Sequence, residues 1–133
     1  QPPDQEYGQS TVAAIREAVA EASQAGRAVL FISERHLIAF EHIPVSLEPD
    51  YETVYLMEMA MANNRGYLEA FEADLADHRY GLIITWRPST GLRGSDRMFG
   101  EENDVWALRV AAPLVRHYKM DVDLDGLWLM VPR

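Results

Sequence analysis

Three arginines lie close together in a glycine- and serine-rich stretch of an otherwise acidic chain. The stretch is RPSTGLRGSDRMFG, residues 87–100, and its arginines are Arg87, Arg93 and Arg97. Arginine side chains and free backbone N–H groups can together bind phosphate or carboxylate groups. An alternative is that these arginines pair with the nearby acids Asp96, Glu101 and Glu102. The spacing makes this stretch a candidate anion-binding site, with that alternative left open.

Other polar side chains stand next to apolar runs that have the length of strands. Glu34 and His36 follow the run 27–33, and the arginine-containing loop follows the run 80–86. Ligands of open α/β sheets bind at the carboxyl ends of the strands. Our candidate ligand-binding residues are Glu34, His36, Arg87, Arg93, Arg97, Glu101 and Asn103. We assign none of them a catalytic role.

Two stretches carry part of a metal-binding pattern. Residues 121–126 (DVDLDG) match the first half of a calcium loop, but the twelfth position is Pro132, which has no side-chain oxygen. His36, Glu41 and His42 are spaced too widely for the H-x-x-E-H signature on one helix face. The chain also lacks both glycine-rich nucleotide-binding motifs. We therefore expect no metal and no cofactor, and an acidic hairpin turn at 121–126.

The composition narrows the possible classes of function. The chain has 133 residues, of which 48% are hydrophobic and 25% charged, as is typical of a globular protein. The formal charge of −9 and the pI of about 4.8 disfavour nucleic-acid binding and passive adsorption to anionic lipid. There is no cysteine, which excludes disulfides, thiolate zinc sites and cysteine catalysis. No apolar run approaches the roughly 20 residues that span a bilayer.

Hydrophobic periodicity and turn residues predict helices that alternate with strands. In chain order we expect a helix over 10–25, a strand over 27–33, a helical turn over 36–42, a strand over 52–58, a helix over 65–78, a strand over 80–86, a loop over 87–100, a helix over 101–117, and a hairpin of strands over 118–124 and 127–131. Two stretches are ambiguous. The stretch 36–42 could also form a strand, and the second half of 52–63, from Met57, also suits a helix.

These elements predict a Rossmann-like three-layer α/β sandwich. Its sheet would be short and mainly parallel, with the first three strands parallel and the C-terminal hairpin added antiparallel at one edge. Residues 1–9 include Pro2 and Pro3 and predict a disordered linker, so that 10–133 would form a single α/β domain. Because the chain begins with Gln1, we expect it to be a piece of a longer protein.

Three segments together resemble a known family. They are RAVLFISERHLIAF (27–40), LMEMAMANNRGYLEAFEADLADHRYGLIIT (56–85) and FGEENDVWALRVAAPLVRHY (99–118). They resemble the C-terminal soluble domain of bacterial polytopic membrane glycosyltransferases of the GT-C type, which are similar to dolichyl-phosphate-mannose-type transferases. The most specific part is FGEEND-W, followed by an apolar helix and a tyrosine.

The resemblance implies a non-catalytic accessory role. The family's catalysis is placed at acidic residues in the first extracytoplasmic loop of the upstream membrane part, so no catalytic residue carries over. It implies a domain on the extracytoplasmic face of the bacterial membrane, whose partner is the upstream transmembrane domain. Its role would be partner recognition or recognition of an acceptor through a sugar or lipid-phosphate. Two alternatives stay open: a free-standing Rossmann-like domain that binds a small anion, and a protein-interaction module with an exposed apolar patch.

Overall fold

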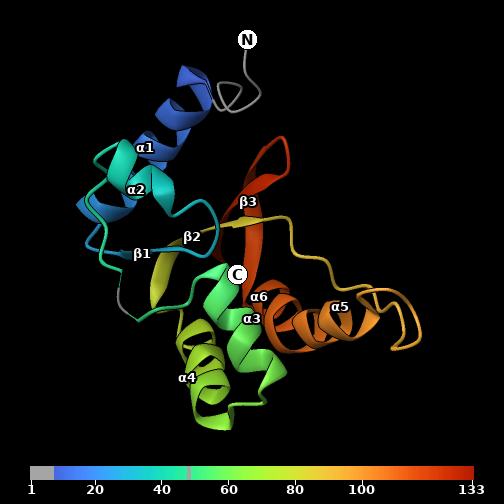
Figure 1. Ribbon diagram of the computed structural model, residues 1–133. Coiled ribbons are helices and arrows are strands. Elements are labelled where there is room, and N and C mark those ends of the chain that lie inside the picture. The colour runs from blue at the N-terminus through green and yellow to red at the C-terminus, as the bar shows by residue number, and fades with distance from the viewer. Residues whose placement is uncertain (1–7, 48) are drawn as a thin grey trace.

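The computed structural model describes residues 8–47 and 49–133 (Figure 1). Its elements in chain order are α1 (Gln9–Gln24), β1 (Ala28–Phe31), α2 (His36–Phe40), α3 (Thr53–Met61), α4 (Arg65–Ala76), β2 (Tyr80–Trp86), α5 (Gly100–Trp106), the π-helical turn η2 (Ala107–Ala111), α6 (Ala112–His117), β3 (Tyr118–Leu124) and β4 (Leu127–Pro132). The predicted linker falls mostly on residues 1–7, outside the described residues. None of the described helices has both the length and the hydropathy needed to cross a bilayer.

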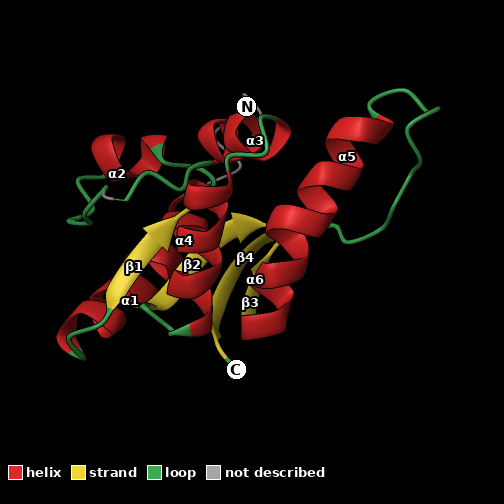
Figure 2. Cartoon of the chain, turned by 90° about the horizontal axis from the view of Figure 1, so that it is seen from below, coloured by secondary structure: helices red, strands yellow, loops and turns green. Residues whose placement is uncertain are grey.

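The protein is an α/β fold built on one four-stranded mixed sheet, whose strand order is β1-β2-β4-β3 (Figure 2). β1 and β2 run parallel, while β4 pairs antiparallel with both β2 and β3. The prediction of a C-terminal hairpin is supported in part, because β3 and β4 pair antiparallel at the C-terminus. Asp125 and Gly126 form its turn with φ angles of 56° and 100°, as the tight turn of a two-residue hairpin requires.

Apolar side chains fill both faces of the sheet. Successive residues of β2 alternate between the faces, so that Ile83 points to one side and Leu82 and Ile84 to the other. On the first face the core includes side chains of α3, α4, η2 and α6: Leu56, Phe71, Leu75, Val110 and Leu114. On the second face it includes side chains of α1 and α2: Ile15, Val19 and Leu37. The sheet is therefore covered by helices on both sides.

The predicted strand over 52–58 is wrong, because this segment forms helix α3. The Glu52 carboxylate accepts the N–H of Tyr55 at 2.6 Å and caps the helix. Leu56 and Ala60, four residues apart, are then buried. Capping and packing thus override the strand preference of the local sequence. Without this strand the sheet keeps only one parallel pair, so the prediction of a mainly parallel sheet is also wrong.

The predicted helix over 101–117 is present, but it contains the π-helical turn. Pro113 is the second residue of α6, two positions after the end of that turn. A proline within a helix lacks the N–H that would bond to the carbonyl four residues earlier, and its ring crowds that carbonyl. Widening the preceding turn accommodates the ring. The other predicted helices, the helical turn after β1 and the strands of β1 and β2 agree with the structure within a few residues.

Candidate functional site

The carboxyl ends of β1 and β2 lie side by side at one edge of the sheet. The N–H groups of Ile32 and Ser33 both donate to the carbonyl of Ile84, at 2.9 and 3.2 Å, which continues the parallel pairing past β1. The chain leaves this edge through Glu34 after β1 and through Arg87 after β2. Two of the predicted site residues, Glu34 and Arg87, therefore lie at the edge of the sheet where α/β folds bind ligands.

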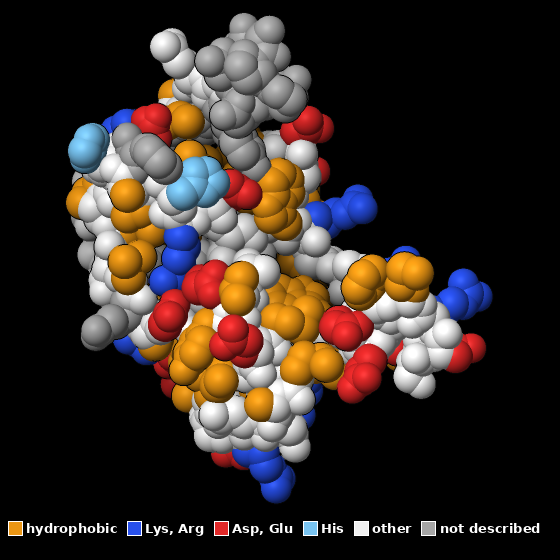
Figure 3. Space-filling model, in the orientation of Figure 1, with side chains coloured by type: hydrophobic (Ala, Val, Ile, Leu, Met, Phe, Trp, Pro, Cys, Tyr) orange, Lys and Arg blue, Asp and Glu red, His pale blue; other side chains and the backbone are white. Residues whose placement is uncertain are grey.

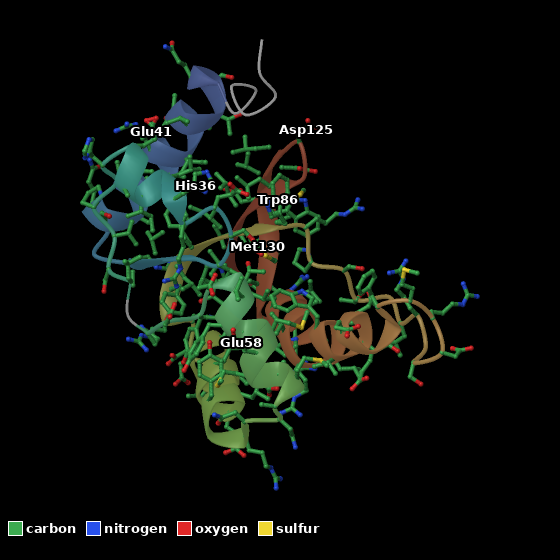
Figure 4. All side chains as sticks on the ribbon, viewed as in Figure 1. His36, Glu41, Glu58, Trp86, Asp125 and Met130 are labelled. Atoms are coloured by element: carbon green, nitrogen blue, oxygen red, sulfur yellow. The ribbon has the colours of Figure 1, made fainter. Side chains whose placement is uncertain are left out.

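Glu34 connects the two strand ends. Its backbone has a φ of 61°, in the left-handed region, and its side chain is only 14% exposed. One carboxylate oxygen accepts the indole N–H of Trp86 at 2.9 Å, and the other lies 3.3 Å from Nε2 of His36. The structure thus brings the two candidate residues Glu34 and His36 together, and Trp86 joins them through Glu34. Figure 4 labels His36 and Trp86, which lie near each other. A carboxylate beside an imidazole can orient that ring for proton transfer.

The hydroxyl groups next to this pair are engaged in structural hydrogen bonds. Ser33 Oγ accepts the backbone N–H of Trp86 at 3.1 Å and lies 3.5 Å from Oγ1 of Thr53. Thr53 donates both its N–H and its hydroxyl to the carbonyl of Ile32, at 3.0 and 2.9 Å. These bonds hold the start of α3 over the end of β1. The carboxyl end of β1 is therefore occupied by the protein's own side chains.

The neighbouring surface is an open depression of about 530 Å³. It is lined by Trp86, Arg87, Asp123, Asp125 and Gly126. The hairpin forms one wall, because Arg87 donates its backbone N–H to the Gly126 carbonyl at 2.8 Å. The Asp123 carboxylate accepts the Gly126 N–H at 2.7 Å, so this acid shapes the turn that the calcium-like pattern contains. Residues 8–47 and 49–133 contain no group of three His, Asp or Glu side chains that could hold a metal ion.

The arginine-containing loop is braced by an acid that the sequence analysis did not select. The Asp104 carboxylate accepts the backbone N–H groups of Arg93 and Gly94, at 2.6 and 2.9 Å. The N–H of Arg93, the side-chain amide of Asn103 and the N–H of Gly94 lower the pKa of the Asp104 carboxyl. Asn103 also donates to the Gly91 carbonyl at 2.8 Å. The backbone donors that we expected to bind an external anion are therefore used by Asp104.

The arginine side chains themselves make no ion pair within the part of the chain that the structure describes. The ion pairs found there belong to Arg16, Arg35, His36 and Arg79. The alternative in which Arg87, Arg93 and Arg97 pair with Asp96, Glu101 and Glu102 is therefore wrong. All three arginines are exposed.

The seven candidate residues fall into two separate groups. Glu34 and His36 lie at the strand end, with Arg87 beside the hairpin. Arg93, Arg97, Glu101 and Asn103 belong to the loop and the first turn of α5. Figures 1 and 2 both place α5 and this loop on the opposite side of the molecule from α2.

Sequence reasoning missed Trp86, Thr53 and Asp104 as members of these groups. Trp86 is 43% exposed and so lies outside the core. Each of the three acts on residues distant in the sequence, so no local motif indicates its role. No protein-family model, no curated protein and no solved structure matches this chain.

Proposed function

We propose that the chain is a non-catalytic accessory domain of a membrane glycosyltransferase-like protein, on the extracytoplasmic face of a bacterial membrane. The family resemblance of segments 27–40, 56–85 and 99–118 suggests this parent protein. The observation that carries the non-catalytic role is the occupied strand end, where Ser33, Glu34 and Thr53 bond to neighbouring groups of the fold. A small-molecule enzyme of this fold class would need an open, largely apolar pocket there.

The proposed partner is the upstream transmembrane domain of the same protein. The proposed ligand class is a sugar or lipid-phosphate, for which the exposed guanidinium groups of Arg93 and Arg97 offer charge-assisted hydrogen bonds. Nucleic acid is not proposed as a ligand, since the formal charge is −9.

We also propose that the fold is a reduced Rossmann-like three-layer sandwich. The two apolar clusters on opposite faces of the sheet support this interpretation. In this interpretation β1 and β2 are the parallel pair that remains of a Rossmann-like sheet. The hairpin β3–β4 takes the place beside β2 that a further parallel strand would have in the full fold. The loss of that strand would also narrow the edge at which Rossmann-like proteins hold nucleotides.

The test is an assay of the 133-residue chain with a polyprenyl-phosphate-linked sugar donor and a mixture of acceptors. We expect no transfer and no hydrolysis above buffer. Glu34→Gln and His36→Asn are assayed in parallel, with Glu58→Gln on the exposed surface of α3 as the matched control. Turnover that the first two variants abolish and the control retains would overturn the non-catalytic role.

A protein-interaction module is the second candidate, and exposed apolar side chains on α3 and η2 favour it. Val54 is 63% exposed and Leu108 is 58% exposed, on segments that contact each other. Figure 3 shows hydrophobic side chains over the region of α3. Co-purification of the separately expressed membrane part with the chain, lost in a Val54→Ser, Leu108→Ser variant, would support this role. Retained co-purification would exclude this surface.

A further inference from the structure

The tip loop, residues 87–99 between β2 and α5, projects from the rest of the molecule (Figures 1 and 2). It also exposes large apolar side chains. Leu92 is 63% exposed, Phe99 68% and Met98 80%, the largest exposure of any large hydrophobic residue described. Figure 3 shows hydrophobic, basic and acidic side chains together on this projection. Exposed apolar side chains of this size, gathered in one loop, indicate a surface that contacts a membrane or another molecule.

The charge of the tip loop is opposite to that of the rest of the chain. Its three arginines and Asp96 give a formal charge of +2, which leaves −11 on the remaining residues of a chain whose total is −9. Within the described residues, Arg93 and Arg97 form no ion pair with the acids around them. Their guanidinium groups are therefore available to an external anion.

The tip loop is held in shape by polar contacts with α5. Asp104 accepts the N–H groups of Arg93 and Gly94, and a Cβ atom on Gly100 would overlap the Gly94 carbonyl. Gly94 and Gly100 therefore lie against each other and close the segment 94–100 into a tight loop. Arg93 precedes this segment, and Phe99 is part of it. Polar backbone groups thus point toward α5, and the apolar side chains are left outside.

Phe99 has an unusual backbone for an aromatic residue. Its φ of 57° lies in the left-handed region, which bulky side chains avoid. The fold does not bury the ring, since the residue is 68% exposed. A strained conformation that no internal packing explains is an observation that points to a functional contact.

We propose that the tip loop docks the chain on an anionic lipid surface. Leu92, Met98 and Phe99 enter the headgroup region, and Arg93 and Arg97 bind lipid phosphates. Asp96 in the loop and Glu101 and Glu102 directly after it oppose this attraction, and Asp104 is hydrogen-bonded to the loop's own N–H groups. Acids farther away than a Debye length of about 8 Å are screened at physiological salt. A narrow projection suits a bilayer better than a protein interface, which covers about 800 Å² on each partner. The docking does not depend on which parent protein carries the domain.

The test measures co-sedimentation of the 133-residue chain with vesicles. Vesicles of equimolar phosphatidylglycerol and phosphatidylcholine should bind it, and vesicles of phosphatidylcholine alone should bind it much less. Raising the salt concentration should weaken the binding. Arg93→Gln and Arg97→Gln should each lower partitioning by about fivefold. Met98→Ser combined with Phe99→Asn should lower it by about tenfold or more.

Matched controls separate docking from a general loss of structure. Asn adopts the left-handed backbone readily, so Phe99→Asn should keep the fold, as circular dichroism would verify. Val54→Ser on α3, where the side chain is as exposed as Leu92, and Arg65→Gln on α4 should leave vesicle binding unchanged. No binding of the unaltered chain to anionic vesicles, or equal losses in the controls, would overturn the proposal. Self-association without lipid that the tip variants abolish would show a protein contact instead and would also overturn it.

Discussion

Tyr118→Phe removes one oxygen atom from the centre of the fold and should be strongly destabilising. Tyr118 is fully buried, and its hydroxyl donates to the Tyr80 carbonyl at 2.6 Å and accepts the Tyr80 N–H at 3.2 Å. The first residue of β3 thus fixes the first residue of β2. Burial is the main cause that raises the pKa of Tyr118 to about 12, so the hydroxyl keeps its proton at neutral pH and can donate.

The expected loss follows from the groups left without a partner. A buried backbone group that loses its hydrogen bond costs about 1–3 kcal/mol, and here both the N–H and the carbonyl of one residue are affected. The second bond is long, so we expect a loss of about 2–4 kcal/mol in the free energy of unfolding. For a chain of this size, that loss lowers Tm by roughly 8–16 °C. Urea titration with an unchanged m-value would measure it directly.

Tyr80→Phe is the matched control, because it removes the same atom from a neighbouring buried tyrosine. The Tyr80 hydroxyl is buried and has no hydrogen-bond partner among the described residues. Its removal should leave stability unchanged or raise it by up to about 1 kcal/mol, since a desolvated hydroxyl is lost. Equal losses in the two variants, or an unchanged Tyr118→Phe protein, would refute the reasoning.

Three further predictions concern pH and the tip loop. Burial is the largest cause that raises the pKa of Tyr80 and of Tyr118 from 10.0 to about 12 in the folded protein. The unfolded chain therefore loses these two protons at a lower pH, and the free energy of unfolding should fall as pH rises from about 10 to about 12. Thermal unfolding measured at alkaline pH would show this fall. Asp104→Ala should speed amide hydrogen exchange at Arg93 and Gly94 with little change in the exchange of β2. Unchanged exchange at these two amides would contradict the role of the Asp104 hydrogen bonds in holding the loop. Gly100→Ala should force the loop apart from the Gly94 carbonyl and lower stability by about 1–3 kcal/mol, whereas an unchanged urea midpoint would show that the contact is not tight.

Much of the fold could be predicted because its signals are local. The apolar spacing of α1 and α4, the continuous apolar run of β2 and the Asp125–Gly126 turn are each set by neighbours in the sequence. Helix α3 could not be predicted with the same success, because Thr53 and Val54 favour a strand while the Glu52 cap and the burial of Leu56 favour a helix. The sheet type depended on that one segment, so a local error became an error of topology.

The candidate site was predictable only in part, for a similar reason. Glu34 and His36 are two residues apart, and their position after a strand indicated the sheet edge. Trp86 and Asp104 act on residues 52 and 11 positions away in the sequence, and only the folded chain brings these pairs together. The arginines stand out in an otherwise acidic chain, but nothing local in the sequence indicates that Asp104 accepts the N–H groups of Arg93 and Gly94.

The central claim, that the carboxyl end of β1 is closed and the domain is non-catalytic, is tested most directly by a nuclear magnetic resonance titration. The chain is titrated with nucleotides, sugar phosphates and a short polyprenyl phosphate, while the backbone amides of 33–36 and 86–87 are observed. We predict that these amides show no saturable shift with any of the compounds. A saturable shift at both strand ends, abolished by Glu34→Gln, would contradict the account and establish a small-molecule site at the edge of the sheet.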